Sequence, residues 1–258
     1  MKPHELELRD VNVFYRKTRV VGDFSAKFQP GMITGIIGPS GAGKSSVLLA
    51  CNKLIYERNG SSTGRIMIDG KNINDKDVNP TKLRRHVGMI FQEPDALPAM
   101  SIANNVLIGY NLVHGDASKK ERALALEENL TKTGLWDQVR NRLDSSGAQL
   151  SGGQKQRLCL ARLFAYKPGV VLLDEPCSAL DVNSIGVFEE LLVSMKGSYT
   201  MAMVTHNLAQ ARRICDWLIV MFPDEKGVGR IVEMGPTEEV FAHPQNPLTA
   251  ALLSGKIG

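Results

Sequence analysis

Residues 32–55 decide the fold and read MITGIIGPSGAGKSSVLLACNKLI. Residues 32–37 form a nearly continuous apolar run, the pattern of a strand buried on both faces of a parallel sheet. Residues 44–55 carry apolar side chains at helical spacing. The glycine-rich segment between the two runs therefore predicts a strand, a tight turn and a helix in direct succession.

The turn, Gly38–Ser45, matches the pattern G-x-x-x-x-G-K-[S/T] after a buried strand and before a helix. Its glycines let successive backbone N–H groups point at an anion, and the helix N-terminus adds a favourable dipole. Lys44 offers a positive charge to the β- and γ-phosphates of a nucleotide, and the Ser45 hydroxyl can bind Mg²⁺. The turn therefore predicts a nucleoside triphosphate site. Its predicted residues are Gly38, Pro39, Ser40, Gly41, Ala42, Gly43, Lys44, Ser45 and Ser46.

A second apolar run, Val170–Leu173, ends in the carboxylates Asp174 and Glu175. Parallel sheets present their ligand groups at the carboxyl ends of strands. Asp174 is suited to hold Mg²⁺ through water, and Glu175 to polarise an attacking water. Two adjacent carboxylates could instead form a solvated turn, but the phosphate loop upstream favours a nucleotide site.

The segment LSGGQ at 150–154 precedes the basic helical pattern KQRLCLARLFA. A serine and two glycines at a helix N-terminus again form an anion-binding arrangement. Helix capping alone would explain Ser151 and one glycine, but not a second phosphate-type site beside one complete nucleotide pocket. A head-to-tail dimer, in which this turn closes on the γ-phosphate held by the other subunit, would explain it.

The composition is that of an ordinary globular chain of 258 residues, with 43% hydrophobic and 22% charged residues. The net charge of +4 is too small to indicate nucleic-acid binding without a clustered basic patch, so we expect no nucleic-acid partner. The four cysteines form no Cys-x-x-Cys pair, which favours packed, reduced thiols. The charged N-terminus does not have the pattern of a signal peptide, and no apolar run approaches the ~18 residues of a membrane span.

The rest of the chain alternates between strand and helix patterns. Residues 5–15 and 24–28 alternate apolar and polar side chains, which predicts an antiparallel sheet. Residues 101–165 have a helical pattern. Further strands are predicted at 64–70, 86–91, 169–175, 200–204 and 217–222. The predicted class is α/β, with a parallel, doubly wound sheet, an N-terminal antiparallel β subdomain and an inserted α-helical subdomain.

These motifs together resemble the ATP-binding-cassette (ABC) ATPases from about residue 5 to the C-terminus. The segments that carry the resemblance, in order, are Gly38–Ser45, Gln92, LSGGQ at 150–154, LLDEP at 172–176, SALD at 178–181 and Thr205–His206. The resemblance implies one ABC ATPase domain over 1–258, with a P-loop NTPase (RecA-like) core and the cofactors ATP and Mg²⁺. The core would cover 1–100 and 166–258, and a helical subdomain with the signature would cover 101–165.

The resemblance also implies roles for single residues. Glu175 matches the general base, and His206 the residue that contacts the γ-phosphate, although a histidine after a strand is more often structural. Tyr15 matches the aromatic residue that stacks on adenine, with core packing or strand pairing as the alternative. Gln92 matches a residue that reaches Mg²⁺ and the water, and Asp181 a loop that contacts the other subunit. The implied signature residues acting in trans are Ser151, Gly152, Gly153 and Gln154, and the implied metal residues are Ser45, Gln92 and Asp174.

Finer resemblance points to the phosphate-importing subfamily, through residues 84–102 and the C-terminal tail. It implies a peripheral ATPase at the cytoplasmic face of the cell membrane. A homodimer or paired ATPase would act there with two membrane-spanning permease subunits and an external solute-binding protein. Residues 103–105 depart from the subfamily pattern near the surface where the membrane partner docks. The alternatives are an importer of molybdate, sulfate or phosphonate, and a soluble ATPase of iron-sulfur assembly. The resemblance also implies that other subunits, and not this one, recognise the transported solute.

Overall fold

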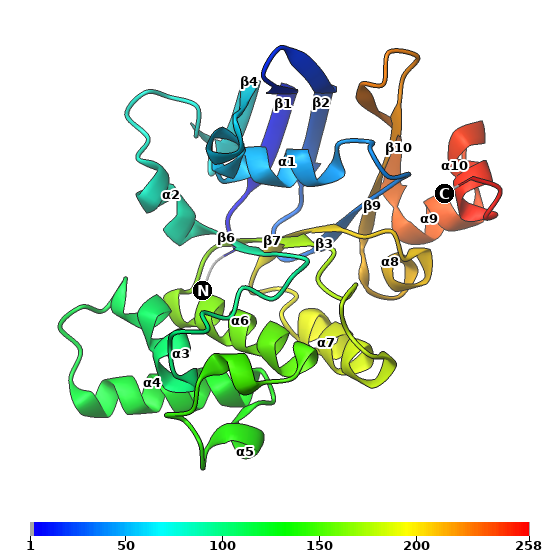
Figure 1. Cartoon of the computed structure of the whole chain (residues 1–258). Coiled ribbons are helices and arrows are strands. Elements are labelled where there is room, and N and C mark those ends of the chain that lie inside the picture. Colours follow the sequence, from blue (N-terminus) through cyan, green and yellow to red (C-terminus); the bar gives the residue numbers. More distant parts are fainter. Residues whose placement is uncertain (1–2, 258) are drawn as a thin grey trace. The chain divides into compact units, whose positions relative to one another are not determined.

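The computed structural model describes residues 3–257. The ends of the predicted 1–258 domain, residues 1–2 and 258, lie outside the described residues. The chain divides into two compact units (Figure 1). The first comprises the chain to Gly88, Gly169–Glu175 and the chain from Met195; the second comprises Met89–Pro168 and Pro176–Ser194. Residues 89–100, 166–168 and 176–194, which the resemblance placed in the nucleotide-binding core, thus belong to the second unit. A subdomain over 101–165 stays a prediction.

The sheet is mixed; nine of its described strands lie in the first unit, and β6 crosses the boundary at Gly88. Among the described residues it has ten strands in the order β5-β4-β1-β2-β10-β9-β3-β8-β7-β6 (Figure 1). The strands are β1 Leu6–Tyr15, β2 Thr18–Phe28, β3 Ile33–Ile37, β4 Gly60–Ile68, β5 Lys71–Asn72, β6 Val87–Ile90, β7 Val170–Asp174, β8 Thr200–Val204, β9 Trp217–Pro223 and β10 Gly229–Pro236. The predicted α/β class is confirmed.

The parallel part of the sheet carries the phosphate loop. Strand β3 pairs in parallel with β8 on one side and β9 on the other, and β7 pairs in parallel with β8. Every residue of β3 and β8 is buried. The continuous apolar runs predicted this arrangement because a parallel strand covered on both faces has no solvent side to carry polar residues.

The antiparallel part of the sheet comes from the N-terminal third. Strand β1 pairs antiparallel with β2 and β4, as the alternating pattern predicts. Strand β4 turns into β5 at Asp69–Gly70, where both residues have positive φ, 48° and 78°. This tight hairpin turn matches the Asp-Gly signal in the sequence. Strand β10, antiparallel to β9, was not predicted, because its segment GRIVEMGP contains two glycines and a proline and shows no clean alternation.

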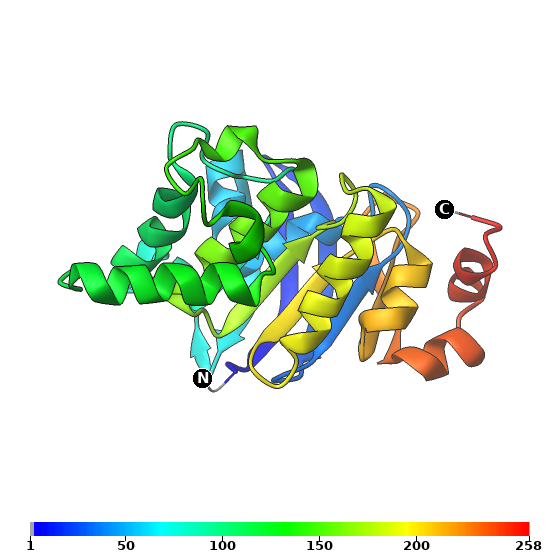
Figure 2. The same ribbon diagram turned by 90° about the horizontal axis from the view of Figure 1, so that it is seen from below.

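Helix α1 begins at the phosphate loop and contacts β1, β2, β4, β7 and β8. The predicted helix over 44–55 breaks earlier, because Lys53 adopts a left-handed φ of 60° and a 3-10 turn follows. Figure 2 shows α9 and α10 following β10 toward the C-terminus. Across residues 3–257, no helix is both long and apolar enough to cross a membrane. The helical segments of this unit are α1 Lys44–Cys51, η1 Leu54–Arg58, α2 Pro80–His86, α8 Leu208–Ile214, α9 Thr237–Ala242 and α10 Pro247–Leu253.

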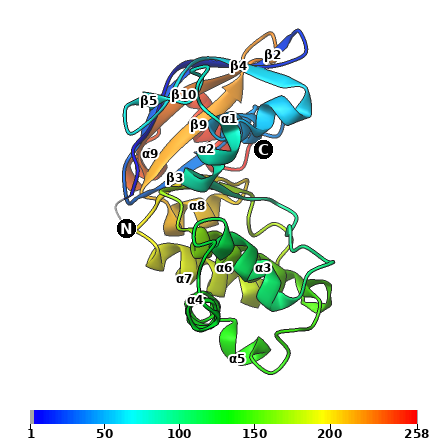
Figure 3. The ribbon, with the colours of Figure 1, turned by 90° about the vertical axis from the view of Figure 1, so that its left-hand side faces the viewer.

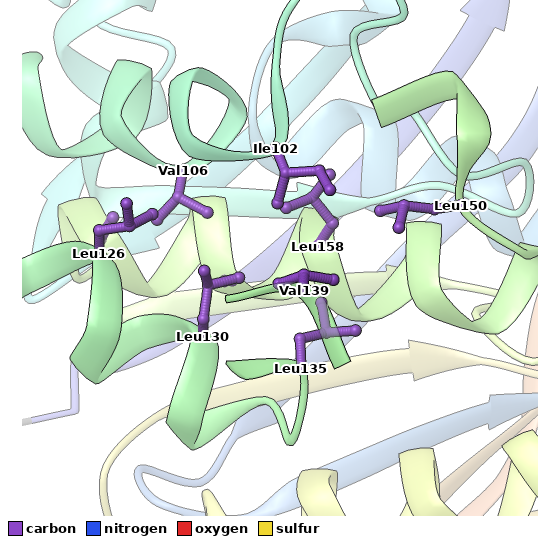
Figure 4. Close-up of a cluster of buried hydrophobic side chains, with 10 residues drawn as sticks. Ile102, Val106, Leu126, Leu130, Leu135, Val139, Leu150 and Leu158 are labelled. Carbon is purple, nitrogen blue, oxygen red and sulfur yellow. The ribbon is translucent and has the colours of Figure 1, made fainter. Parts of the chain in front are cut away.

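The second unit is mainly helical (Figure 3). It has its own hydrophobic core. Its segments are α3 Ile102–Asn111, α4 Lys119–Lys132, α5 Trp136–Val139, η2 Gly147–Gln149, α6 Gly152–Tyr166 and α7 Val182–Ser194. The core side chains recur three or four residues apart on α3, α4 and α6, as the helical pattern predicts (Figure 4). They are Ile102, Val106, Leu126, Leu130, Leu135, Val139, Leu150, Leu158, Ala161 and Ala165.

A buried asparagine organises the loop that precedes α3. Asn105 is fully buried, and its Oδ1 accepts from the backbone N–H of Leu97 at 2.9 Å. Its Nδ2 donates to the carbonyl oxygens of Leu97, Met100 and Ser101 at 3.0–3.3 Å. One side chain therefore hydrogen-bonds four backbone groups of this loop, so the buried amide of Asn105 is itself satisfied.

We expect Asn105→Leu to lower the free energy of unfolding by about 2 kcal/mol, because it removes the side-chain acceptor of the Leu97 N–H and the amide that donates to three carbonyl oxygens. Equilibrium urea unfolding measures the change. Asn104→Leu is the matched control, because Asn104 is exposed and should change stability by less than ~0.5 kcal/mol. Equal effects of the two substitutions would show that the Asn105 bonds do not stabilise the fold.

Candidate nucleotide site

The phosphate loop has the backbone that an anion-binding turn needs. Gly38, Gly41 and Gly43 all have positive φ, of 144°, 82° and 82°. At Gly38 a Cβ atom would lie 2.1 Å from the carbonyl oxygen of Met221, so no other residue fits there. The loop ends where α1 begins, so the first N–H groups of the helix are available to a phosphate.

The lysine of the loop is folded back on it. Lys44 is buried, and its Nζ donates to the carbonyl oxygens of Gly38 at 2.7 Å and of Pro39 at 2.8 Å. Burial lowers the pKa of the ammonium group, and the charges of Glu175 and Asp174 oppose that shift. The carbonyl bonds hold the positive charge inside the loop, where a phosphate would meet it.

A cavity of about 300 Å³ opens at the loop. It is lined by Val20, Ser40, Gly41, Gly43, Lys44, Ser45, Ser46 and Glu175. All of these residues except Val20 are predicted site residues. Val20 was missed because its position against the loop depends on the pairing of β2 within the sheet and not on any local motif.

The pair Ser45 and Asp174 is suited to a magnesium ion. The Ser45 hydroxyl donates to Oδ1 of Asp174 at 2.7 Å. Burial raises the pKa of Asp174, and the bond from Ser45 acts in the opposite direction. A cation beside this half-buried carboxylate would relieve the cost of its charge, and hydroxyl and carboxylate oxygens are ligands that Mg²⁺ accepts. The residues therefore fit the ion.

Glu175 and His206 form another polar pair at this site. Oε2 of Glu175 lies 2.9 Å from Nδ1 of His206, and the Glu175 backbone N–H donates to the carbonyl of Val204 at 2.9 Å. Glu175 has a left-handed φ of 46°, which is strained for a residue with a long side chain. That backbone turn aims the carboxylate into the cavity beside the phosphate loop.

Tyr15 ends β1, where it pairs with Thr18 and Gly60 of the neighbouring strands. Its phenolic oxygen accepts from the Ser46 hydroxyl at 3.4 Å, so the side chain reaches the start of α1. Strand pairing, the alternative to adenine stacking, is present. The adenine contact stays a prediction.

The signature turn lies in the second unit and forms a capping box at the start of α6. Ser151 Oγ accepts from the Gln154 N–H at 3.3 Å, and Gln154 Oε1 accepts from the Ser151 N–H at 3.1 Å. A Cβ atom at Gly153 would lie 2.5 Å from Oγ of Ser184, so close packing against α7 requires this glycine. Capping explains Ser151 and Gln154, and packing explains Gly153, without a second subunit. A role of the signature turn in trans stays a prediction.

Asp181 caps α7 in the same unit. Its Oδ1 accepts from the backbone N–H groups of Asn183 at 3.1 Å and Ser184 at 3.0 Å, and its Oδ2 accepts from the Ser184 hydroxyl at 2.6 Å. The bonds from Ser184 hold the pKa of Asp181 below its usual value. Because Ser184 also touches Gly153, the loop of Asp181 and the signature turn are linked through one serine.

The predicted site residues thus fall into two groups. The first unit brings together Tyr15, the phosphate loop, Asp174, Glu175 and His206. The second unit carries Gln92, which is exposed, together with the signature turn and Asp181. A parallel sheet whose strand ends hold a phosphate loop and a carboxylate pair is the architecture of a nucleoside triphosphatase of the P-loop class.

Residues 21–178 match the ABC transporter family. The chain belongs to this family, whose members bind ATP. The family that the sequence motifs indicated is confirmed.

Relatives are similar over almost the whole chain. The Phosphate import ATP-binding protein PstB of Tropheryma whipplei (strain Twist) is 42% identical over 255 residues, which are 98% of each chain. The protein of the same name from Mycolicibacterium smegmatis is 41% identical over 98% of each chain. That from Corynebacterium efficiens is 41% identical over 98% of this chain and 99% of its own.

Solved structures share the fold. A bacterial Atm1-family ABC exporter with ATP bound superposes with a TM-score of 0.78 at 24% identity; the match covers 100% of this chain and 42% of the exporter chain. The cbiO1 protein of Clostridium perfringens, part of the ABC transporter complex cbiONQ, gives a TM-score of 0.77 at 28% identity, over 93% of this chain and 92% of its own. Both neighbours confirm an ABC ATPase fold.

Proposed function

We propose that this chain is the ATP-hydrolysing subunit of an ABC importer of inorganic phosphate. The observation that carries the proposal is its identity of 41–42%, over 98% of its length, to bacterial proteins named for phosphate import. ATP hydrolysis is coupled to transport in this role. The geometry of the first unit supports ATP hydrolysis, because the phosphate loop and Glu175 line one cavity, Asp174 is bonded to Ser45, and His206 is bonded to Glu175.

The residues of the site have different roles in the proposed reaction. Lys44 and the backbone N–H groups of the phosphate loop bind and neutralise the triphosphate. Ser45 and Asp174, with Gln92, would hold Mg²⁺, which supplies charge neutralisation to the β- and γ-phosphates when bound. Glu175 accepts a proton from the attacking water, and His206, paired with it at 2.9 Å, orients its carboxylate and contacts the γ-phosphate.

The second unit would complete the site in a dimer. In a head-to-tail pair, the turn Ser151–Gln154 of one subunit would close on the γ-phosphate bound by the other, and Asp181 would contact the partner. Two permease subunits and an external solute-binding protein would complete the importer. The ATPase pair would then sit on the permease subunits at the cytoplasmic face of the membrane.

Uptake of labelled phosphate tests this function. Cells that lack the gene should lose high-affinity phosphate uptake and should regain it with the wild-type gene but not with the Glu175→Gln variant. Uptake of molybdate, sulfate and phosphonate is measured in the same cells. Loss of one of those activities with normal phosphate uptake would assign the chain to another anion importer. Co-purification with soluble scaffold proteins, and not with membrane subunits, would indicate the iron-sulfur assembly class.

A further inference from the structure

A buried glutamine outside the recognised motifs joins two segments of the second unit. Gln156 lies on α6, two residues after the signature, and is fully buried. Its Nε2 donates to the carbonyl oxygen of Phe91 at 3.1 Å and to that of Pro176 at 2.9 Å. Both hydrogens of one amide group therefore hold backbone that is 65 and 20 residues away in sequence.

The two carbonyls flank residues of the proposed reaction. Phe91 directly precedes Gln92, and Pro176 directly follows Glu175. The segment after Gln92 is tied to the same helix a second time, because Arg162 donates to the carbonyl oxygen of Asp95 and its guanidinium lies 3.7 Å from the Asp95 carboxylate. Helix α6, whose first turn is the signature, thus holds the Gln92 segment at both ends.

The orientation of the Gln156 amide is set by these bonds. Its Oε1 is buried and makes no hydrogen bond among the described residues, so turning the amide over would satisfy nothing and would place an oxygen against two carbonyl oxygens. A glutamine kept here with an unsatisfied oxygen is better explained by the two carbonyls that it fixes than by packing alone.

We propose that Gln156 is a positioning residue for ATP hydrolysis. It fixes the backbone at Phe91 and Pro176 to the signature helix, so that Gln92 and Glu175 keep their places when the signature turn engages nucleotide. The proposal rests on the proposed ATPase function. Gln156 is absent from the lining of the nucleotide cavity, so its loss should change turnover and leave nucleotide affinity intact.

Steady-state ATPase assays of the assembled transporter, with ATP affinity measured in parallel, test the proposal. Gln156→Met keeps the length of the side chain and removes both donors. We expect kcat to fall about tenfold, within the ~10²-fold that a misplacement of 1 Å can cost, and the Kd for ATP to change less than about twofold. Gln29→Met, the same change at an exposed glutamine directly after β2, should leave both values unchanged.

A second variant separates positioning from packing. Gln156→Glu places a carboxyl group against two carbonyl oxygens; only its protonated form can donate, and burial raises the pKa of such a group. We expect the kcat of this variant, relative to wild type, to rise as the pH falls from about 8 to about 6. Gln156→Glu also tests the positioning role if Gln156→Met does not fold.

Wild-type kcat in Gln156→Met, equal losses of kcat and ATP affinity, or a pH-independent ratio for Gln156→Glu would overturn the positioning role. Failure of the proposed function is a different result, in which the wild-type chain itself shows no ATP hydrolysis that depends on Glu175.

Discussion

Replacing Glu175 with glutamine should slow ATP hydrolysis by about 10²–10⁴-fold, the range expected when a general base is lost. The substitution keeps the shape of the side chain and its place in the cavity but removes the group that accepts a proton from water. Lys44 and the phosphate loop are untouched, so ATP should still bind. The variant should therefore accumulate as a dimer with nucleotide held between its subunits.

Single-turnover hydrolysis, nucleotide-binding titration and size-exclusion chromatography measure these three outcomes. Glu190→Gln makes the same change at an exposed site on α7 and should hydrolyse ATP at the wild-type rate. Near-normal turnover of Glu175→Gln would exclude Glu175 as the base. The Gln92 side chain or His206 would then have to activate the water.

Replacing Lys44 with methionine should weaken ATP binding and turnover together. The lysine is the buried cation of the loop, and its bonds to the carbonyl oxygens of Gly38 and Pro39 hold it there. Hydrogen bonds to charged groups are worth about 1.5–3 kcal/mol, or roughly ten- to a hundredfold in affinity. Loss of a donor to the developing charge should also lower kcat by about 10²–10³-fold.

Isothermal titration with a slowly hydrolysed ATP analogue, combined with steady-state kinetics, measures both effects. Lys82→Met is the matched control, because Lys82 is exposed and lies outside the nucleotide cavity. Unchanged affinity in Lys44→Met would mean that the backbone N–H groups alone bind the triphosphate and that Lys44 acts only on the transition state.

Much of the first unit could be predicted because its signals are local. Strands β3, β7 and β8 are continuous apolar runs, and the phosphate loop is a contiguous motif. The break after Cys51 and the strand β10 were not predicted, because a left-handed residue at Lys53 and pairing with β9 depend on contacts that no short window contains. Tertiary contacts override weak local preference at such places.

The candidate site also contains residues that local motifs predict and residues that they miss. Motifs identified Asp174 and Glu175 but not Val20 or Gln156, because the partners of those residues lie far away in sequence. At the signature, the pattern indicated an anion site, whereas the structure shows that Gly153 is needed for packing against Ser184. A motif can therefore locate a residue correctly and still leave open which of two physical reasons keeps it there.

In the proposed function, this chain couples ATP hydrolysis to phosphate import. The most direct measurement is the ATPase rate of the complex, reconstituted in proteoliposomes with the permease subunits of the same organism and its solute-binding protein. We expect phosphate-loaded binding protein to stimulate hydrolysis and to drive labelled phosphate into the vesicle lumen, and we expect Glu175→Gln to abolish both. An ATPase rate that does not change with phosphate, and that responds to another anion or to no anion, would contradict the proposed function.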